Sequence, residues 1–176
     1  RFLKNHREFG EYPALIVMFR PQGEDTHATQ YKREFWDILD FLQKSDPEPW
    51  PASVPTDPYH PKWQYCFAGQ PVFIVARAPF YEARKSRHTA HGLEITFQPW
   101  TNFEGLTGLD DKGQEARTLI RRRLSQYDDV DKHPDAGDLD DPRKLEWQEY
   151  MVPDNNIEGV VRFPLSERSD VENTMN

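Results

Sequence analysis

The chain has 176 residues and a formal net charge of −8, with 30 Asp and Glu against 22 Lys and Arg. This length suits one domain, and the acidity disfavours a nucleic-acid or anionic-membrane partner. A single cysteine, Cys66, excludes an intramolecular disulfide and favours a cytoplasmic location, and no apolar run reaches the length of about 20 residues that spans a bilayer.

The first predicted elements are a strand and a helix. Residues 12–21 (YPALIVMFRP) are a continuous apolar run between prolines, which predicts a buried central strand. Apolar residues then recur at helical spacing from Asp25 to Ser45, which predicts an amphipathic helix. We expect its aromatic residues to belong to the core rather than to a cofactor site, and these are Tyr31, Phe35 and Trp36.

An irregular segment and a hairpin follow. Residues 46–61 (DPEPWPASVPTDPYHP) contain too much proline for a regular element, and we expect Trp50 and Tyr59 to pin this segment onto the domain. Residues 63–79 (WQYCFAGQPVFIVARAP) predict two short strands joined by a turn around Ala68 and Gly69.

The second half of the chain predicts one more strand and one more helix. Residues 92–100 (GLEITFQPW) alternate apolar and polar side chains, as a strand with one polar face does. Residues 112–128 read as a helix with apolar residues on one side and four arginines largely on the other. An acidic loop covers residues 128–141, and residues 144–152 (KLEWQEYMV) predict a last short element.

This order of elements predicts an α+β (mixed α/β) fold. We expect a single domain over residues 1–165, with a central, mostly antiparallel sheet flanked by helices and long irregular loops. The close spacing of neighbouring strands disfavours parallel crossovers. Residues 166–176 form a polar tail that we expect to be mobile.

A basic stretch stands out in this acidic chain. Between the predicted strands, Arg84 and Arg87 are three residues apart, so on a helical turn they would share a face and could hold carboxylates or a phosphate. The alternative is a solvated surface in which these cations pair with nearby acids. The residues alone leave both interpretations open.

Three histidines are candidate metal ligands. His88 and His91 have the i, i+3 spacing that suits two ligands on one turn, but a third ligand is not evident, and surface residues are the alternative. His133 lies in the acidic loop, where we expect it to be exposed unless the loop places it over a pocket. Cys66 fits a core position better than a nucleophile, and Walker A, GxGxxG and GxSxG patterns are missing.

Several features taken in order resemble the YqcI/YcgG family over roughly Tyr12 to Asn156. They are the hairpin FAGQPVFIVA, the segments EARKSRH and LEITFQPWTNFEGL, and HPDAG ahead of EWQEYMVPDNN. The positions matched most closely are Arg84 and Arg87, and Glu146, Trp147 and Tyr150.

The resemblance implies a b-type haem enzyme. The family includes haem-dependent N-hydroxylases of natural-product biosynthesis, such as that of the guanitoxin pathway, which oxygenate the side-chain nitrogen of arginine-like or lysine-like amino acids. The mechanism that it implies needs an axial histidine. Because this sequence has few other candidates, our hypothesis is that His133 is the ligand, with His88 or His91 as alternatives. Arg84 and Arg87 would clamp the haem propionates or the substrate carboxylate.

The same resemblance implies the rest of the site. Glu146, Trp147 and Tyr150 would line the substrate pocket, and an electron donor or peroxide would serve as partner. The oligomeric state stays open, a homodimer included. This chain departs from the family at two positions that could hold the axial ligand of the iron. Many relatives have His-Pro where this chain has Ala78-Pro79, and a histidine within the segment that corresponds to residues 98–100. Relatives also begin with a Phe-Pro-Cys-like segment that this sequence lacks.

Two other classes of function compete with the oxygenase. The first is a haem or small-anion binding or sensor protein without turnover, in which protein ligands would hold both faces of the iron. The second is a binding module without haem, in which residues 84–91 recognise a phosphorylated or carboxylated partner.

Overall fold

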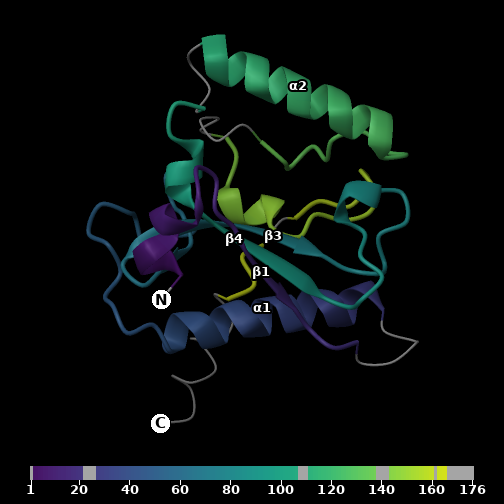
Figure 1. Ribbon diagram of the computed structural model, residues 1–176. Coiled ribbons are helices and arrows are strands. Elements are labelled where there is room, and N and C mark those ends of the chain that lie inside the picture. Colours follow the sequence, from purple (N-terminus) through teal and green to yellow (C-terminus); the bar gives the residue numbers. More distant parts are fainter. Residues whose placement is uncertain (1, 22–26, 107–110, 138–142, 161, 166–176) are drawn as a thin grey trace.

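The computed structural model describes residues 2–21, 27–106, 111–137, 143–160 and 162–165. The fold is α+β and forms one domain, as predicted, with α1 and α2 on opposite sides of a sheet (Figure 1). The described residues also contain four short 3-10 helices, and they are η1 (Leu3–Phe9), η2 (Lys85–Arg87), η3 (Trp100–Phe103) and η4 (Glu146–Glu149). The predicted polar tail, residues 166–176, lies outside the described residues.

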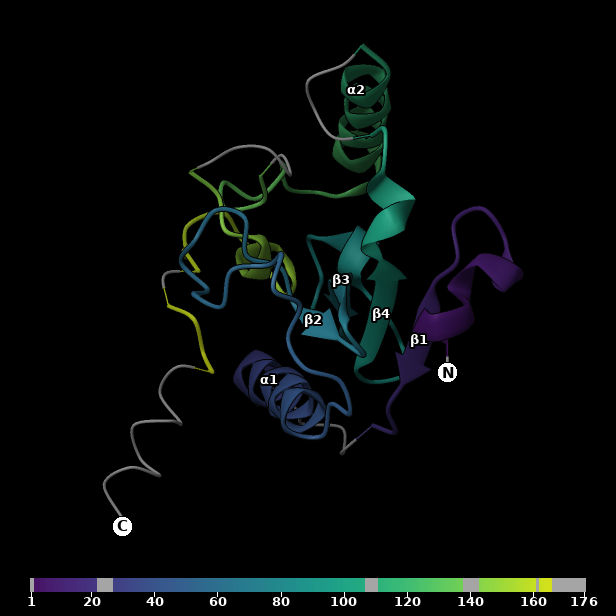
Figure 2. The same cartoon turned by 90° about the vertical axis from the view of Figure 1, so that its left-hand side faces the viewer.

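The sheet has four antiparallel strands in the order β1-β4-β3-β2, which Figure 2 shows side by side. The strands are β1 (Leu15–Met18), β2 (Cys66–Phe67), β3 (Gln70–Arg77) and β4 (Glu94–Pro99). In register, Ile74 of β3 lies opposite Phe97 of β4, and Phe97 lies opposite Leu15 of β1. The mostly antiparallel sheet predicted from the short connections is therefore confirmed.

The first strand differs from its prediction. We expected residues 12–21 to form a buried central strand, but β1 lies at the edge of the sheet and pairs only with β4. Leu15, Ile16 and Met18 are exposed. A continuous apolar run indicates what could be buried, but it does not reveal which segment pairs with the second side of a strand.

The predicted hairpin is confirmed in β2 and β3. Its two turn residues, Ala68 and Gly69, have φ of 53° and 75°. Two successive residues with positive φ are typical of the type I′ turn, whose twist matches that of the strands. The Asp46 carboxylate accepts the Ala68 N–H at 2.9 Å and so ties the turn to the end of α1.

Helix α1 (Ala28–Lys44) supplies much of the core. It covers one face of the sheet, as Figures 1 and 2 show together, and it buries Tyr31, Phe35, Trp36 and Leu39. These side chains pack with Ile74 and other buried residues of the strands, so the core assignment of the aromatic face is confirmed.

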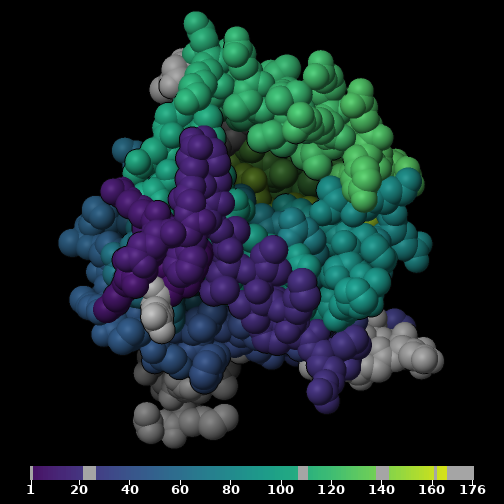
Figure 3. All heavy atoms as spheres, in the orientation of Figure 1, coloured from purple at the N-terminus to yellow at the C-terminus, as the bar shows by residue number. Residues whose placement is uncertain are grey.

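Helix α2 (Asp111–Tyr127) forms where a helix was expected, but it packs little. Gly113 is its one buried residue among those described, and Leu119 and Ile120 are exposed. The residue that follows α2 holds it to η2, because the Asp128 carboxylate accepts the N–H and the hydroxyl of Ser86 at 2.7 and 2.8 Å. Figure 3 shows the surface hollowed beneath α2.

The proline-rich segment has no helix or strand among its residues 46–61, as predicted. Trp50 stacks on Trp63 with ring centroids 6.1 Å apart, and Tyr59 contacts Trp147 edge to face at 6.0 Å. Both expected anchors therefore pin the segment to the domain. Neither α1 nor α2 has the length and apolarity that a membrane-crossing helix requires, and the same holds for every helix in the described ranges.

Candidate functional site

Arg84 is buried and bonded within the protein. Its Nε donates to the carbonyl oxygen of Pro153 at 3.1 Å, and its Nη2 donates to Asn156 Oδ1 at 2.9 Å. Nη1 lies 3.3 Å from the carbonyl oxygen of Asp131. The guanidinium therefore joins two distant loops, because residues 131 and 153–156 both converge on it.

Arg87 is the second member of the predicted anion clamp. Its Nη2 donates to the carbonyl oxygen of Glu149 at 3.0 Å, and its Nη1 donates to those of Tyr150 at 3.0 Å and Ala76 at 3.3 Å. Burial lowers the pKa of this guanidinium. Arg87 thus ties β3 to the end of η4, and the anion-clamp role of the two arginines stays a prediction.

His133, the predicted axial ligand, is buried rather than exposed, with 1% of its surface accessible. Its Nδ1 accepts the N–H of Asp135 at 3.1 Å, so Nε2 carries the proton and donates to the carbonyl oxygen of Glu158 at 2.9 Å. Desolvation lowers the pKa of the ring. Both ring nitrogens are therefore engaged, and neither offers a lone pair to a metal in this arrangement.

His88 has a different arrangement. Its Nδ1 lies 2.8 Å from the carbonyl oxygen of Tyr81, which can only accept, so Nδ1 carries the proton and Nε2 has a lone pair. His88 and His91 are both exposed, and η2 ends at Arg87 before either of them. In the described ranges, no three His, Cys, Asp or Glu side chains cluster as metal ligands would.

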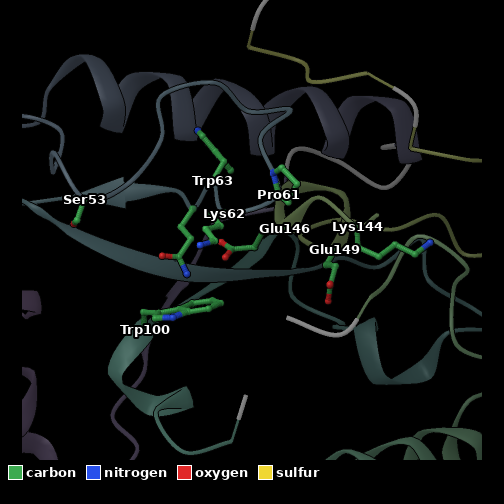
Figure 4. A pocket seen from close by; sticks show the side chains of 9 residues that line it. Ser53, Pro61, Lys62, Trp63, Trp100, Lys144, Glu146 and Glu149 are labelled. Carbon is green, nitrogen blue, oxygen red and sulfur yellow. The ribbon is translucent and has the colours of Figure 1, made fainter. Parts of the chain in front are cut away.

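A half-open cavity of about 260 Å³ lies between the proline-rich segment, η3 and η4. Two glutamates, two tryptophans and two lysines dominate its lining, with Ser53, Pro61 and Gln64 completing it. The pairs are Glu146 and Glu149, Trp63 and Trp100, and Lys62 and Lys144. Figure 4 shows the Glu146 carboxylate and the Lys62 side chain directed toward the same part of the cavity.

Glu146 has the most perturbed acid–base chemistry of this cavity. Burial raises the pKa of its carboxyl group to about 8, and the nearby Glu149 raises that pKa further, while hydrogen bonds from Tyr150 and Gln64 oppose the rise. Tyr150 donates its hydroxyl hydrogen to Glu146 and accepts the N–H of Tyr65 at 3.3 Å. A carboxyl group in this range can hold or release a proton near neutral pH.

The neighbouring side chains of η4 are held in place. Glu149 accepts the N–H of Gly137 at 2.9 Å, and Lys144 donates to the carbonyl oxygen of Pro134 at 2.5 Å. These bonds attach the loop that carries His133 to the cavity. The carboxyl groups of Glu146 and Glu149 therefore line a cavity whose walls are fixed from several segments.

The structure separates the three residues predicted for the substrate pocket. Glu146 lines the cavity, whereas Trp147 and Tyr150 are fully buried behind it. The indole N–H of Trp147 donates to the carbonyl oxygen of Pro58 at 2.8 Å. Trp147 and Tyr150 thus support the wall, and Glu146 is the member of the trio that a ligand in the cavity can reach.

Sequence reasoning missed most of the cavity lining. Trp63 precedes β2, Trp100 follows β4 at the start of η3, and Glu149 ends η4. These segments are far apart in the chain, so no local spacing signals that they meet. The two acids of the sequence EWQE, three residues apart on a short helix, were the available sign of a shared face.

Comparison with known proteins identifies relatives over nearly the whole chain. The model of the YqcI/YcgG family matches residues 1–166. The chain is 35% identical to the uncharacterised protein YcgG of Bacillus subtilis (strain 168) over 175 residues, which cover 98% of this chain and 68% of YcgG. It is 36% identical to the uncharacterised protein YqcI of the same organism over 152 residues, which cover 85% of this chain and 59% of YqcI.

A more distant relative carries a provisional functional name. The chain is 29% identical over 157 residues to the provisionally named N(omega)-hydroxy-L-arginine synthase DcsA of Streptomyces lavendulae, which covers 89% of this chain and 59% of DcsA. The chain thus spans between about three fifths and two thirds of the length of these relatives. No solved structure matches the chain. The match over most of the sequence shows that the chain belongs to the YqcI/YcgG family.

Proposed function

We propose that the cavity binds the cationic end of an arginine-like or lysine-like amino acid, as the substrate site of a side-chain N-hydroxylase. The observation that carries this proposal is that two glutamates and Trp100 line one small cavity. The provisional name of DcsA, which specifies N-hydroxylation of arginine, supports the same substrate class.

The lining suits a guanidinium or ammonium group. Carboxylate oxygens accept hydrogen bonds from such groups, and the ring of Trp100 favours a nearby cation. The two carboxyl groups and the aromatic ring therefore offer partners to the cationic end of such a ligand.

Glu146 gives the cavity a proton-transfer group. A cation beside this carboxyl favours its ionised form, so binding lowers its pKa from about 8 and releases its proton. Oxygenation of a guanidinium or ammonium nitrogen requires that nitrogen to lose a proton. The ionised Glu146 is the acceptor for this proton, and Tyr150 holds the carboxylate in position through its hydroxyl group.

A b-type haem, which the family resemblance implies, would supply the activation of oxygen. The described residues do not form a complete site for it. His133 has both ring nitrogens engaged, and His88 has a suitable Nε2 but is exposed and lines none of the described cavities. We therefore assign the cavity substrate binding and proton transfer only.

Haem uptake itself can be measured by titration with hemin, followed in the visible spectrum. If haem binds through His88 or His133, His88→Ala should change the Soret band, because Nε2 of His88 has a lone pair and neither nitrogen of His133 does. His133→Gln should leave the band in place. The opposite pattern would restore His133 as the axial ligand and would require its two hydrogen bonds to break.

Isothermal titration calorimetry of ligand binding tests the substrate class. L-Arginine should bind, and L-citrulline, which has nearly the same shape without the charge, should bind at least about tenfold more weakly. Glu149→Gln should weaken arginine binding by a similar factor, while Glu115→Gln on the exposed surface of α2 should leave it unchanged. Equal affinity for arginine and citrulline would refute the cavity assignment.

Product analysis separates an enzyme from a binding protein. Incubation with L-arginine, hemin and a reductant or peroxide, followed by mass spectrometry, should yield a hydroxylated arginine that the Glu149→Gln variant makes more slowly. Arginine binding without any product under these conditions would favour the alternative of a small-molecule binding or sensor protein.

A further inference from the structure

Exposed apolar side chains gather around β1. Of the eleven large apolar residues that are exposed in the described part of the chain, six lie on or beside this strand. They are Phe9, Tyr12, Leu15, Ile16, Met18 and Phe41. Figure 3 shows the N-terminal segment, in purple, on the face toward the viewer, with no other part of the chain in front of it. Such a concentration of apolar surface on one edge marks an interaction site.

An apolar cleft adjoins the same strand. It has a volume of about 400 Å³ and runs between α1 and the sheet face that carries Leu15, Val17 and Phe97. Ile38 and Phe41 of α1 form its opposite wall. The cleft continues the apolar surface of β1 toward α1, so one interaction partner could cover both.

The hydrogen-bonding groups of β1 point in two directions. The N–H of Phe19 donates to Leu93 of the segment before β4 at 2.8 Å. Because bonding alternates along an antiparallel pair, the backbone groups of Leu15 and Val17 also face β4. The N–H and C=O groups of Ile16 and Met18 therefore point outward, and they form a template for one more strand.

We propose that β1 pairs antiparallel with β1 of a second copy of this chain, so that two four-stranded sheets become one. The outward N–H and C=O groups belong to even-numbered residues. A regular pairing therefore places even-numbered residues of the two copies opposite each other. The register with Ile16 opposite Ile16 of the second copy sets Ala14 opposite Met18 and uses the outward groups of both strands.

The charges at the two ends of the segment favour this arrangement. Glu11 precedes β1 and Arg20 follows it, and both are exposed. Continued beyond β1, this pairing brings the end of the segment that carries Arg20 in one copy toward the end that carries Glu11 in the other. A parallel pairing would instead place like charges side by side, at a cost in stability. The segment is therefore complementary to itself in the antiparallel direction.

The two-fold axis of such a pairing is perpendicular to the sheet, so α1 of both copies lies on the same side. The two apolar clefts then meet across the axis. Specific interfaces bury about 1,200–2,000 Å², and a strand of four residues supplies only part of that area. A stable dimer therefore also needs the contact between the two clefts. Phe41 on each α1, which is 67% exposed, is placed to fill the joined cleft.

Sedimentation equilibrium of the purified chain tests the dimer. The protein should be dimeric at micromolar concentration, and Ile16→Glu should raise the dissociation constant at least about tenfold. The control is Ile120→Glu, which alters an equally exposed isoleucine on α2 and should leave the dissociation constant unchanged. A monomeric wild-type chain, or equal effects of the two variants, would overturn the proposal.

A charge exchange tests the direction of pairing without touching the apolar residues. Glu11→Lys and Arg20→Glu should each weaken the dimer, and the double variant should restore most of the affinity. Both positions are exposed, so folding should survive even if Ile16→Glu does not fold. A double variant that dimerises no better than the single ones would exclude the antiparallel arrangement.

Discussion

Replacing Glu146 with glutamine should change how the stability of the protein depends on pH. The pKa of Glu146 is about 8 in the folded protein, against 4.5 for an ordinary glutamate. Between these values the unfolded chain has lost the proton that the folded protein still holds. The unfolded state then binds fewer protons, so the free energy of unfolding falls as pH rises, until the folded group also ionises near pH 8.

The magnitude follows from the width of this window. Each pH unit corresponds to about 1.4 kcal/mol, so a move from about pH 4.5 to about pH 7 costs the wild-type protein about 3 kcal/mol through this one group. Glutamine cannot ionise, and its oxygen can still accept the hydroxyl hydrogen of Tyr150. The variant should therefore lose this pH dependence while keeping the packing of the cavity wall.

Urea unfolding at about pH 5 and about pH 7 measures the effect, through the difference between wild type and variant at each pH. The free energy of unfolding of Glu146→Gln, relative to that of wild type, should be about 2–3 kcal/mol higher at about pH 7 than at about pH 5. Glu115→Gln, on the exposed surface of α2, should show no such change. An equal difference at both pH values would mean that Glu146 titrates normally, which would refute the raised pKa.

Three further predictions concern the scaffold of the site. Gly92→Ala should destabilise the protein by about 1–3 kcal/mol in urea unfolding, because a Cβ at φ +94° would lie 2.8 Å from the carbonyl oxygen of Phe19; an unchanged midpoint would contradict this. Ala68→Gly should stabilise the protein by up to about 1 kcal/mol, since φ of 53° strains alanine, and a loss of stability would argue against the strained turn. Cys66 should react with a thiol reagent at least about a hundredfold more slowly in the folded than in the unfolded protein, because burial raises its pKa to about 12, and fast labelling of the native protein would refute this.

Local patterns predicted most of the elements. The helical spacing of Tyr31, Phe35 and Leu39 indicated α1, and the alternation of residues 92–100 indicated β4. The turn at Ala68 and Gly69 followed from loop length and turn chemistry. The edge position of β1 could not be predicted, because its apolar run would look the same if another segment paired with its outer side.

The site was less predictable, because it depends on contacts between distant segments. Family resemblance drew attention to Glu146, but nothing local indicated that Trp63 and Trp100 would meet it in one cavity. The charge of Arg87 was evident, whereas the backbone carbonyl groups that surround it were not. Similarly, an isolated histidine in an acidic loop gave no sign that both nitrogens of His133 would be bonded.

Calorimetry of butylguanidinium binding tests whether a cation binds beside Glu146. This ligand keeps one positive charge and has no other titrating group. At about pH 7.5, titrations in two buffers of different ionisation enthalpy should show that binding releases a proton to the buffer, and Glu146→Gln should abolish the release. Binding with no proton release in the wild-type protein, or with the same release in the variant, would show that the cation does not bind beside a protonated Glu146.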